Sequence, residues 1–167
     1  MNDLRNGILD INGFLVTPRT TARELEKHFG TKAKQSPINP EYIFWDLGDQ
    51  TFFNEGIEFK AYMSFTGDKL DDLYLYPQLP DVVSKYGIKG EWKYPTSGDP
   101  DTDLAYFREV REILDKWLEK SLGVPTKKDD RITSYRFSAL RIHTYSYMQD
   151  SRHGVVVEGG KVTIRYE

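Results

Sequence analysis

The clearest structural signal in the sequence is the nine-residue stretch Ile57-Glu58-Phe59-Lys60-Ala61-Tyr62-Met63-Ser64-Phe65. Apolar residues occupy every second position, and this period is typical of a β-strand with one face in the core. The turn-forming pair Gly67-Asp68 follows, and residues 73–76 (Leu-Tyr-Leu-Tyr) alternate in the same way until Pro77. The pattern predicts two consecutive strands of an antiparallel sheet.

The residues before this stretch predict a strand or small hairpin at 9–16 and then a short helix. Thr21 and Glu24 have the spacing of a capping box, and Gly30 can supply a left-handed cap, so we expect an amphipathic helix over residues 21–29. Residues 42–46 and 51–53 are expected to pair as a hairpin through the turn-prone Gly48-Asp49, with a further turn at residues 54–56.

The second half begins after a change of character. Residues 79–102 contain three prolines and no sustained period, which favours a long connection. Apolar residues then recur in steps of three and four until Gly123, so residues 103–122 predict the longest helix. Residues 132–148 are expected to be extended, and residues 155–166 predict a hairpin that turns at Gly159-Gly160.

The predicted fold class is α+β, with a mainly antiparallel twisted sheet and two principal helices on one face. The order helix, glycine and alternating strands occurs in residues 1–78 and again in 103–167, with 79–102 as linker, and we expect one compact unit. Tyr42 and Tyr135 follow Gly30 and Gly123 at equal distances, but the register breaks later. Two interpretations stay open: a pair of fused pseudo-repeats, and the similarity that any two helix-and-meander units share.

Residues 8–76 carry a resemblance to a known class of domains. Its elements are Thr21-Ala22-Arg23-Glu24-Leu25, Phe29-Gly30, Tyr42-Ile43-Phe44-Trp45-Asp46 and Gly56-Ile57. They resemble small bacterial domains of the cytoplasmic immunity-protein type, whose helix-plus-sheet units are similar in plan to the tandem-repeat β-lactamase inhibitor proteins. The resemblance implies an α+β fold and a protein partner, such as a toxin, and it brings no catalytic residues.

Composition restricts the function classes. The chain has 167 residues and a formal net charge of −3, so it lacks the basic field that nucleic acid or an anionic membrane would require. Without cysteine it cannot form disulfides or thiolate metal sites. The first residues show no apolar stretch long enough for a signal peptide or a membrane span, so we expect a cytoplasmic protein.

The search for catalytic motifs predicts no catalytic residue, metal site or cofactor. Asp99-Pro100-Asp101-Thr102-Asp103 resembles the start of an EF-hand loop, but the required later glycine and glutamate are missing, so we interpret it as a helix cap. Asp150-Ser151-Arg152-His153 places Ser, His and Asp in one turn, where neighbours cannot adopt triad geometry.

The strand faces opposite the predicted core carry the most informative residues. This set, which we call the tyrosine face, consists of Tyr62, Tyr74, Tyr76, Arg141, His143, Tyr145 and Tyr147. Tyrosine and arginine are enriched at interaction hot spots because each combines a large apolar area with a polar group. The alternative is that the long helix covers this face and the tyrosines are packing residues.

The sequence therefore favours a non-catalytic protein-binding module, most concretely an immunity-type inhibitor that occludes a toxin or enzyme through the tyrosine face. A second hypothesis is a small-molecule-binding protein or enzyme with a pocket between sheet and long helix, using Arg141, His143 and Tyr145. A preformed concave pocket would favour this second hypothesis. A third is a subunit that buries the face by self-association.

Overall fold

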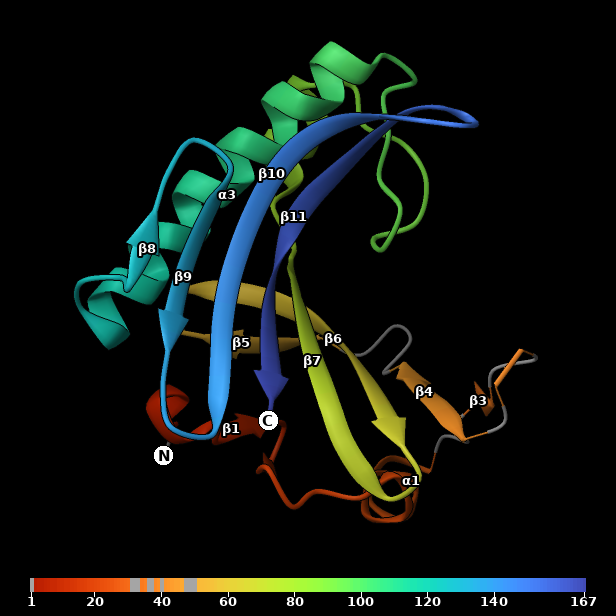
Figure 1. Ribbon diagram of the computed structural model, residues 1–167, viewed down its shortest axis with the longest axis vertical. Helices are drawn as coiled ribbons and strands as arrows, with labels where there is room; N and C mark the ends of the chain where they lie inside the picture. Colours follow the sequence, from red (N-terminus) through yellow and green to blue (C-terminus); the bar gives the residue numbers. More distant parts are fainter. Residues whose placement is uncertain (1, 31–33, 36–37, 40, 47–50) are drawn as a thin grey trace.

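The computed structural model describes residues 2–30, 34–35, 38–39, 41–46 and 51–167. One large antiparallel sheet dominates it, with strand order β3-β4-β6-β7-β11-β10-β9-β8 and with β5 also paired to β6 (Figure 1). The strands are β3 (Lys34–Gln35), β4 (Tyr42–Asp46), β5 (Phe52–Asn54), β6 (Ile57–Thr66), β7 (Lys69–Pro77), β8 (Lys127–Lys128), β9 (Ile132–Arg136), β10 (Leu140–Ser151) and β11 (Gly154–Tyr166). The predicted α+β class and antiparallel sheet are confirmed.

The chain begins with a short 3₁₀-helix, Leu4–Asn6, and a separate hairpin of β1 (Leu9–Ile11) and β2 (Phe14–Val16). Asn12 and Gly13 form its turn with positive φ angles of 50° and 85°. These are the left-handed conformations that a tight two-residue turn needs.

Two helices pack on the same face of the sheet, as the sequence predicted. The first, α1 (Ala22–Phe29), has the predicted capping box: the Thr21 hydroxyl accepts from the Glu24 amide, and the Glu24 carboxylate accepts from the Thr21 amide at 2.8 Å. The long helix α3 (Pro100–Leu122) starts at Asp99, which accepts from the Thr102 amide at 2.9 Å, so the aspartate run does begin with a helix cap.

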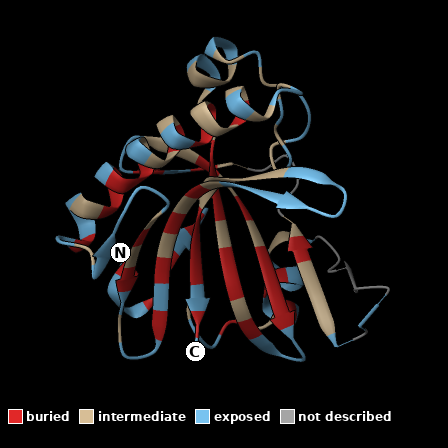
Figure 2. Cartoon of the chain, turned by 45° about the horizontal axis from the view of Figure 1, so that its top comes forward, coloured by how far each residue is buried: buried red, intermediate tan, exposed pale blue. Residues whose placement is uncertain are grey.

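Aromatic contacts attach both helices to the core face. Phe29 of α1 lies 5.2 Å from Trp45 of β4, and Trp117 of α3 lies 5.1 Å from Phe59 of β6, measured between ring centroids. The buried side of α3 faces β10 and β11, while its outer side is exposed (Figure 2). The two helices therefore leave the opposite face of β6, β7, β10 and β11 for other contacts.

The two halves have the same element order. Each contains a helix, a two-residue strand, a five-residue strand and two long antiparallel strands. The first half adds β5 and, before α1, the 3₁₀-helix and the β1–β2 hairpin. The last strands of the halves, β7 and β11, pair at the middle of the sheet with Leu75 opposite Val162 and Leu73 opposite Ile164. The helix-and-meander order that the sequence showed twice is thus built into one continuous sheet.

One expectation in the first part of the chain is wrong. Strands β4 and β5 do not pair with each other; they pair with different ends of β6, β4 with residues 62–66 and β5 with residues 57–59. Strand β6 is long enough to pair with both strands. The expected turn at Gly48-Asp49 lies outside the described residues. The linker also contains a helix, α2 (Pro80–Lys85), whose six residues are too few to show a period.

The predicted hairpin at Gly159-Gly160 is also wrong, because β11 runs through the glycine pair without turning. The turn lies earlier, between Ser151 and Gly154, and β10 pairs with β11 along almost its whole length. The ladder shifts register between Thr144 and Ser146, opposite the glycines. A Cβ on Gly160 would lie 2.8 Å from two ring atoms of Phe107, so the pair allows α3 to approach the strand closely.

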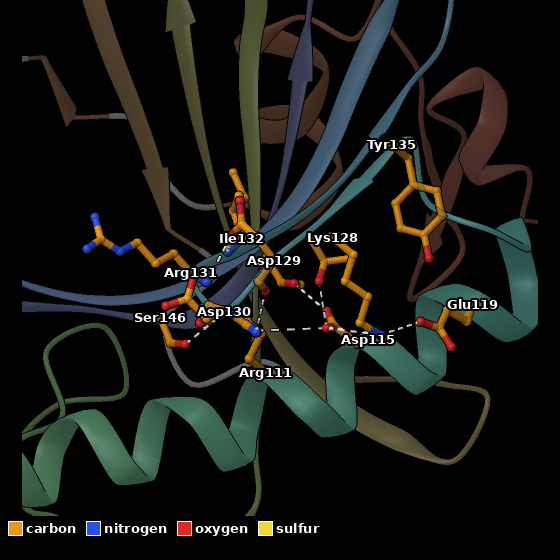
Figure 3. Close-up of polar contacts among 12 residues, drawn as sticks. Arg111, Asp115, Glu119, Lys128, Asp129, Asp130, Arg131, Ile132, Tyr135 and Ser146 are labelled. Atoms are coloured by element: carbon orange, nitrogen blue, oxygen red, sulfur yellow. Dashed lines mark hydrogen bonds and ion pairs between the residues drawn. The ribbon is translucent and has the colours of Figure 1, made fainter.

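A buried carboxylate fixes the middle of α3 to the sheet (Figure 3). Asp115 accepts hydrogen bonds from the hydroxyls of Thr133, at 2.7 Å, and Thr144. Arg111 and Lys128 lie 3.9 and 3.8 Å from the same carboxylate. Because the charge is only 5% exposed and has partners on two strands, it determines where α3 sits along β9 and β10.

Candidate functional site

The tyrosine face lies opposite the helix-packed core face. Leu73 and Leu75 of β7 point into the core, whereas Tyr74 between them is half-buried on the other side. Tyr62, His143 and Tyr145 are likewise half-buried, and Tyr76 is 8% exposed. The body of α3 does not cover these residues, so the alternative in which the long helix buries them is not what the structure shows.

A cavity of about 800 Å³ opens on the tyrosine face. Four strands supply its floor: Tyr62 from β6, Tyr74 and Tyr76 from β7, His143 and Tyr145 from β10, and Lys161, Thr163 and Arg165 from β11. Its walls are residues 93–98 of the linker, Pro100, Asp103 and Phe107 at the start of α3, and residues 155–159 at the start of β11. The site is therefore concave, and only the first turns of α3 reach it.

The linker wall is held on the sheet by ionic and aromatic contacts. The Lys93 ammonium lies 2.6 Å from the Asp46 carboxylate and 4.9 Å from the centroid of the Tyr62 ring. Trp92 packs edge-on against Tyr76, with centroids 4.8 Å apart, and largely buries it. These contacts preform one side of the cavity.

Three tyrosine rings surround the ammonium of Lys161 on the cavity floor. Its Nζ lies 5.4 Å from the ring centroid of Tyr74, 5.5 Å from that of Tyr76 and 5.6 Å from that of Tyr145. Among the described residues no carboxylate lies within ion-pair distance of this ammonium, and none of them accepts a hydrogen bond from it. Burial lowers the pKa of Lys161, and the charge of Glu158 partly opposes that change.

The other charged groups of the cavity have partners. Arg165 donates to Asp72 at 2.8 Å, and the same carboxylate accepts from the Tyr74 hydroxyl at 3.1 Å. The Asp103 carboxylate accepts from the hydroxyls of Thr96 and Ser97. Lys161 differs from these groups because its neighbours are ring faces.

Burial favours the neutral forms of the titratable rings on the cavity floor. Burial, assisted by the charge of Arg165, lowers the pKa of His143, against the opposing effect of Asp72. Burial also raises the pKa of Tyr74 to about 12 and raises the pKa values of Tyr62, Tyr76 and Tyr145. The phenols therefore keep their protons and can donate hydrogen bonds.

Comparison of the chain with protein-family models, curated proteins and solved structures finds no match. The cavity is therefore the feature of the molecule that indicates its function. No helix among the described residues has the length and apolar character to cross a membrane. The described residues likewise contain no group of three or more His, Asp or Glu arranged to hold a metal ion.

Five of the seven predicted site residues line the cavity, namely Tyr62, Tyr74, Tyr76, His143 and Tyr145. Arg141 and Tyr147 do not line it: Arg141 pairs with Glu167, and the Tyr147 hydroxyl donates to Glu158 at 2.9 Å. The pocket hypothesis placed a site between the sheet and the long helix; the cavity lies on the tyrosine face, and α3 contributes to it only Pro100, Asp103 and Phe107.

Lys161 is the main residue that sequence reasoning missed. It stands two positions before Thr163 and four before Arg165, so alternation along β11 places all three on one face. This alternation is visible in the sequence. The turn expected at Gly159-Gly160, however, placed Lys161 next to a hairpin loop and not within a continuous strand. Lys93 and Phe107 carried no comparable signal, because only tertiary packing brings them to the cavity.

Proposed function

We propose that the protein binds a small organic molecule in the cavity on its tyrosine face. The observation that carries this proposal is the preformed concave shape, whose volume of about 800 Å³ falls in the range usual for ligand pockets. Half-buried rings offer flat apolar contact, and the hydroxyls of Tyr62, Tyr76 and Tyr145 have no hydrogen-bond partner among the described residues. Small-molecule sites in proteins usually combine aromatic surface with a few polar groups that are free to bind the ligand.

Molecules that stay bound through purification test the proposal. We expect mass spectrometry of the denatured protein, or a thermal-shift screen of metabolites, to identify a compound that binds the wild-type chain. The double variant Tyr74→Ala/Tyr145→Ala should lose this compound, because it removes two ring contacts from the floor. Tyr86→Ala, which removes a tyrosine outside the cavity lining, is the matched control.

Absence of any released or stabilising compound would contradict the proposal. Equal loss of the compound in Tyr86→Ala and in the double variant would also contradict it, because binding would then not depend on the floor. Circular dichroism of each variant separates lost binding from lost folding.

A second candidate is the immunity-type inhibitor, which would meet its toxin in the cytoplasm. The observation that favours it is exposed apolar area at the cavity mouth: Tyr94 on the linker wall is 74% exposed, and Val155 on the β11 wall is 46% exposed. Exposed apolar residues beside a concave surface suit a protein segment inserted between the walls.

Variants at the cavity mouth distinguish the two candidate functions, because only a protein partner would depend on the exposed mouth residues. If a protein partner is the occupant, Tyr94→Asp/Val155→Asp should abolish capture of one stoichiometric protein by the tagged chain. If a small molecule is the occupant, the same variant should keep its compound and lose no stoichiometric protein.

A further inference from the structure

The cavity floor holds more free hydrogen-bond donors than free acceptors. The Lys161 ammonium has three N–H groups that are directed at no oxygen of the described residues. The rings of Tyr76 and Tyr145 lie beside it, and their hydroxyls likewise have no hydrogen-bond partner among these residues. Ring faces attract an ammonium only weakly compared with an oxygen anion in a partly buried site. The strongest additional interaction that the cavity can make is therefore with a negatively charged group of a ligand.

The remaining ions of the lining do not satisfy Lys161. Arg165 and Lys93 already pair with Asp72 and Asp46. The carboxylates of the lining are also occupied: Asp103 by Thr96 and Ser97, and Glu158 by the Tyr147 hydroxyl. Glu158 lies beyond ion-pair distance from Lys161 and acts on it only through its field.

The surroundings of Lys161 also indicate the rest of the ligand. The walls contribute the apolar side chains of Pro95, Phe107 and residues 155–157, while the floor contributes flat tyrosine rings. An anion without an apolar body, such as a bare inorganic ion, would leave these surfaces unused.

We propose that the cavity binds an organic carboxylate whose negative group contacts the Lys161 ammonium and whose apolar body lies along the tyrosine rings. This inference rests on the proposed small-molecule function and names its ligand class. The carboxylate supplies the acceptor that Lys161 lacks, and the neighbouring hydroxyls of Tyr76 and Tyr145 donate to its second oxygen.

A charge series tests the proposal with the full-length protein. The probes are phenylacetate, its neutral amide phenylacetamide and the cation phenethylamine, each titrated to about 10 mM, because small fragments bind weakly. Binding is followed by the backbone amide NMR signals of residues 74, 145, 161 and 163. We expect phenylacetate to bind at least about tenfold more tightly than the amide, and phenethylamine to bind most weakly.

Variants assign the preference to Lys161. Lys161→Met keeps the length of the side chain without its charge and should remove the advantage of phenylacetate over the amide. Lys161→Arg restores a cation and should restore that advantage. Lys116→Met, an exposed site on α3 outside this cavity, should change neither.

Each contrary result has a distinct meaning. If the amide binds as tightly as phenylacetate, or if Lys161→Met keeps the preference, the carboxylate inference is overturned while the small-molecule function stands. If phenylacetate produces no shifts at these residues, the inference is also overturned. The search for bound compounds then decides the function separately.

Discussion

At the scale of single residues, buried charge has opposite uses on the two faces of the sheet. Asp115 on the core face has hydroxyl donors and cations around it, and it joins α3 to two strands. The Lys161 ammonium on the tyrosine face lies over three aromatic rings and has no ion-pair or hydrogen-bond partner within the described part of the chain. The first arrangement joins a helix to the sheet and serves stability, whereas the second leaves an ammonium to which the proposed ligand would supply an acceptor.

Removal of the carboxylate at position 115 should be costly. Asp115→Ala leaves the Thr133 and Thr144 hydroxyls and the Arg111 guanidinium without their shared partner, so we expect the free energy of unfolding to fall by about 3 kcal/mol. Urea denaturation measures the change. Glu112→Ala, on the exposed side of the same helix, should cost less than about 0.5 kcal/mol. Equal losses in the two variants would show that the network does not hold the helix.

At the scale of elements, β11 both joins the two halves of the sheet and lines the cavity. It pairs with β7 and β10, carries Lys161 and Arg165 on the cavity side, and receives Phe107 of α3 against its glycine pair. The close approach of Phe107 is what brings the start of α3 into the cavity wall. The glycine pair thus shapes the site by allowing this approach, and Gly159 itself lines the cavity.

A methyl group at position 160 should disturb this approach. Gly160 has a φ of 74°, and an added Cβ would lie 2.8 Å from the Phe107 ring, so Gly160→Ala should cost about 2–4 kcal/mol in unfolding free energy. Gly67→Ala, at a φ of 59° with open space around it, should cost only the conformational part, about 1 kcal/mol. Thermal or urea denaturation compares the two.

A double variant isolates the ring contact. Because Phe107→Ala removes the ring that the new methyl group would meet, Gly160→Ala/Phe107→Ala should lose less stability than the sum of its single variants. Strict additivity would show that the cost at position 160 is conformational alone.

The sequence predicted the elements whose signals are local. The capping box of Thr21 and Glu24, the left-handed cap at Gly30 and the alternation in residues 57–65 each depend on a few adjacent residues, and each is confirmed. The same alternation correctly separated Tyr74 from Leu73 and Leu75. Five floor residues of the cavity could therefore be predicted without a structure.

The missed features depend on partners distant in the chain. A glycine pair suits both a turn and a close helix approach, and only Phe107, some fifty residues earlier, distinguishes them at Gly159-Gly160. The cavity wall is likewise set by the contacts of Lys93 with Asp46 and of Trp92 with Tyr76. No short-range pattern encodes these contacts, so the concave shape could not be predicted.

At the scale of the whole molecule, the halves form one continuous structure because their last strands pair. Leu73 and Leu75 face Ile164 and Val162 across the β7–β11 ladder, and all four belong to a single hydrophobic core that also contains Trp45 of the first half and Trp117 of the second. Neither half can expose this seam without uncovering apolar surface.

We therefore expect the halves to unfold together. Hydrogen-exchange mass spectrometry across a urea series should give the same midpoint for peptides from β6 and from β10. Two separated midpoints would show that residues 1–78 and 103–167 are independently stable units.

The mirrored strand order has a consequence for behaviour at high concentration. Because the long strands meet in the middle, the path of paired strands ends at the two-residue β3 and β8, and β8 consists of exposed Lys127 and Lys128. A neighbouring molecule can extend a sheet only where a row of free N–H and C=O groups is presented, and β8 presents only a short row. The lysines of β8 add like-charge repulsion between copies. The longer free rows lie on the outer parts of β10 and β11, because β10 pairs with β9 only through residues 141–145 and β11 pairs with β7 only through residues 162–165. Strand-by-strand growth towards fibrils would therefore begin at this hairpin.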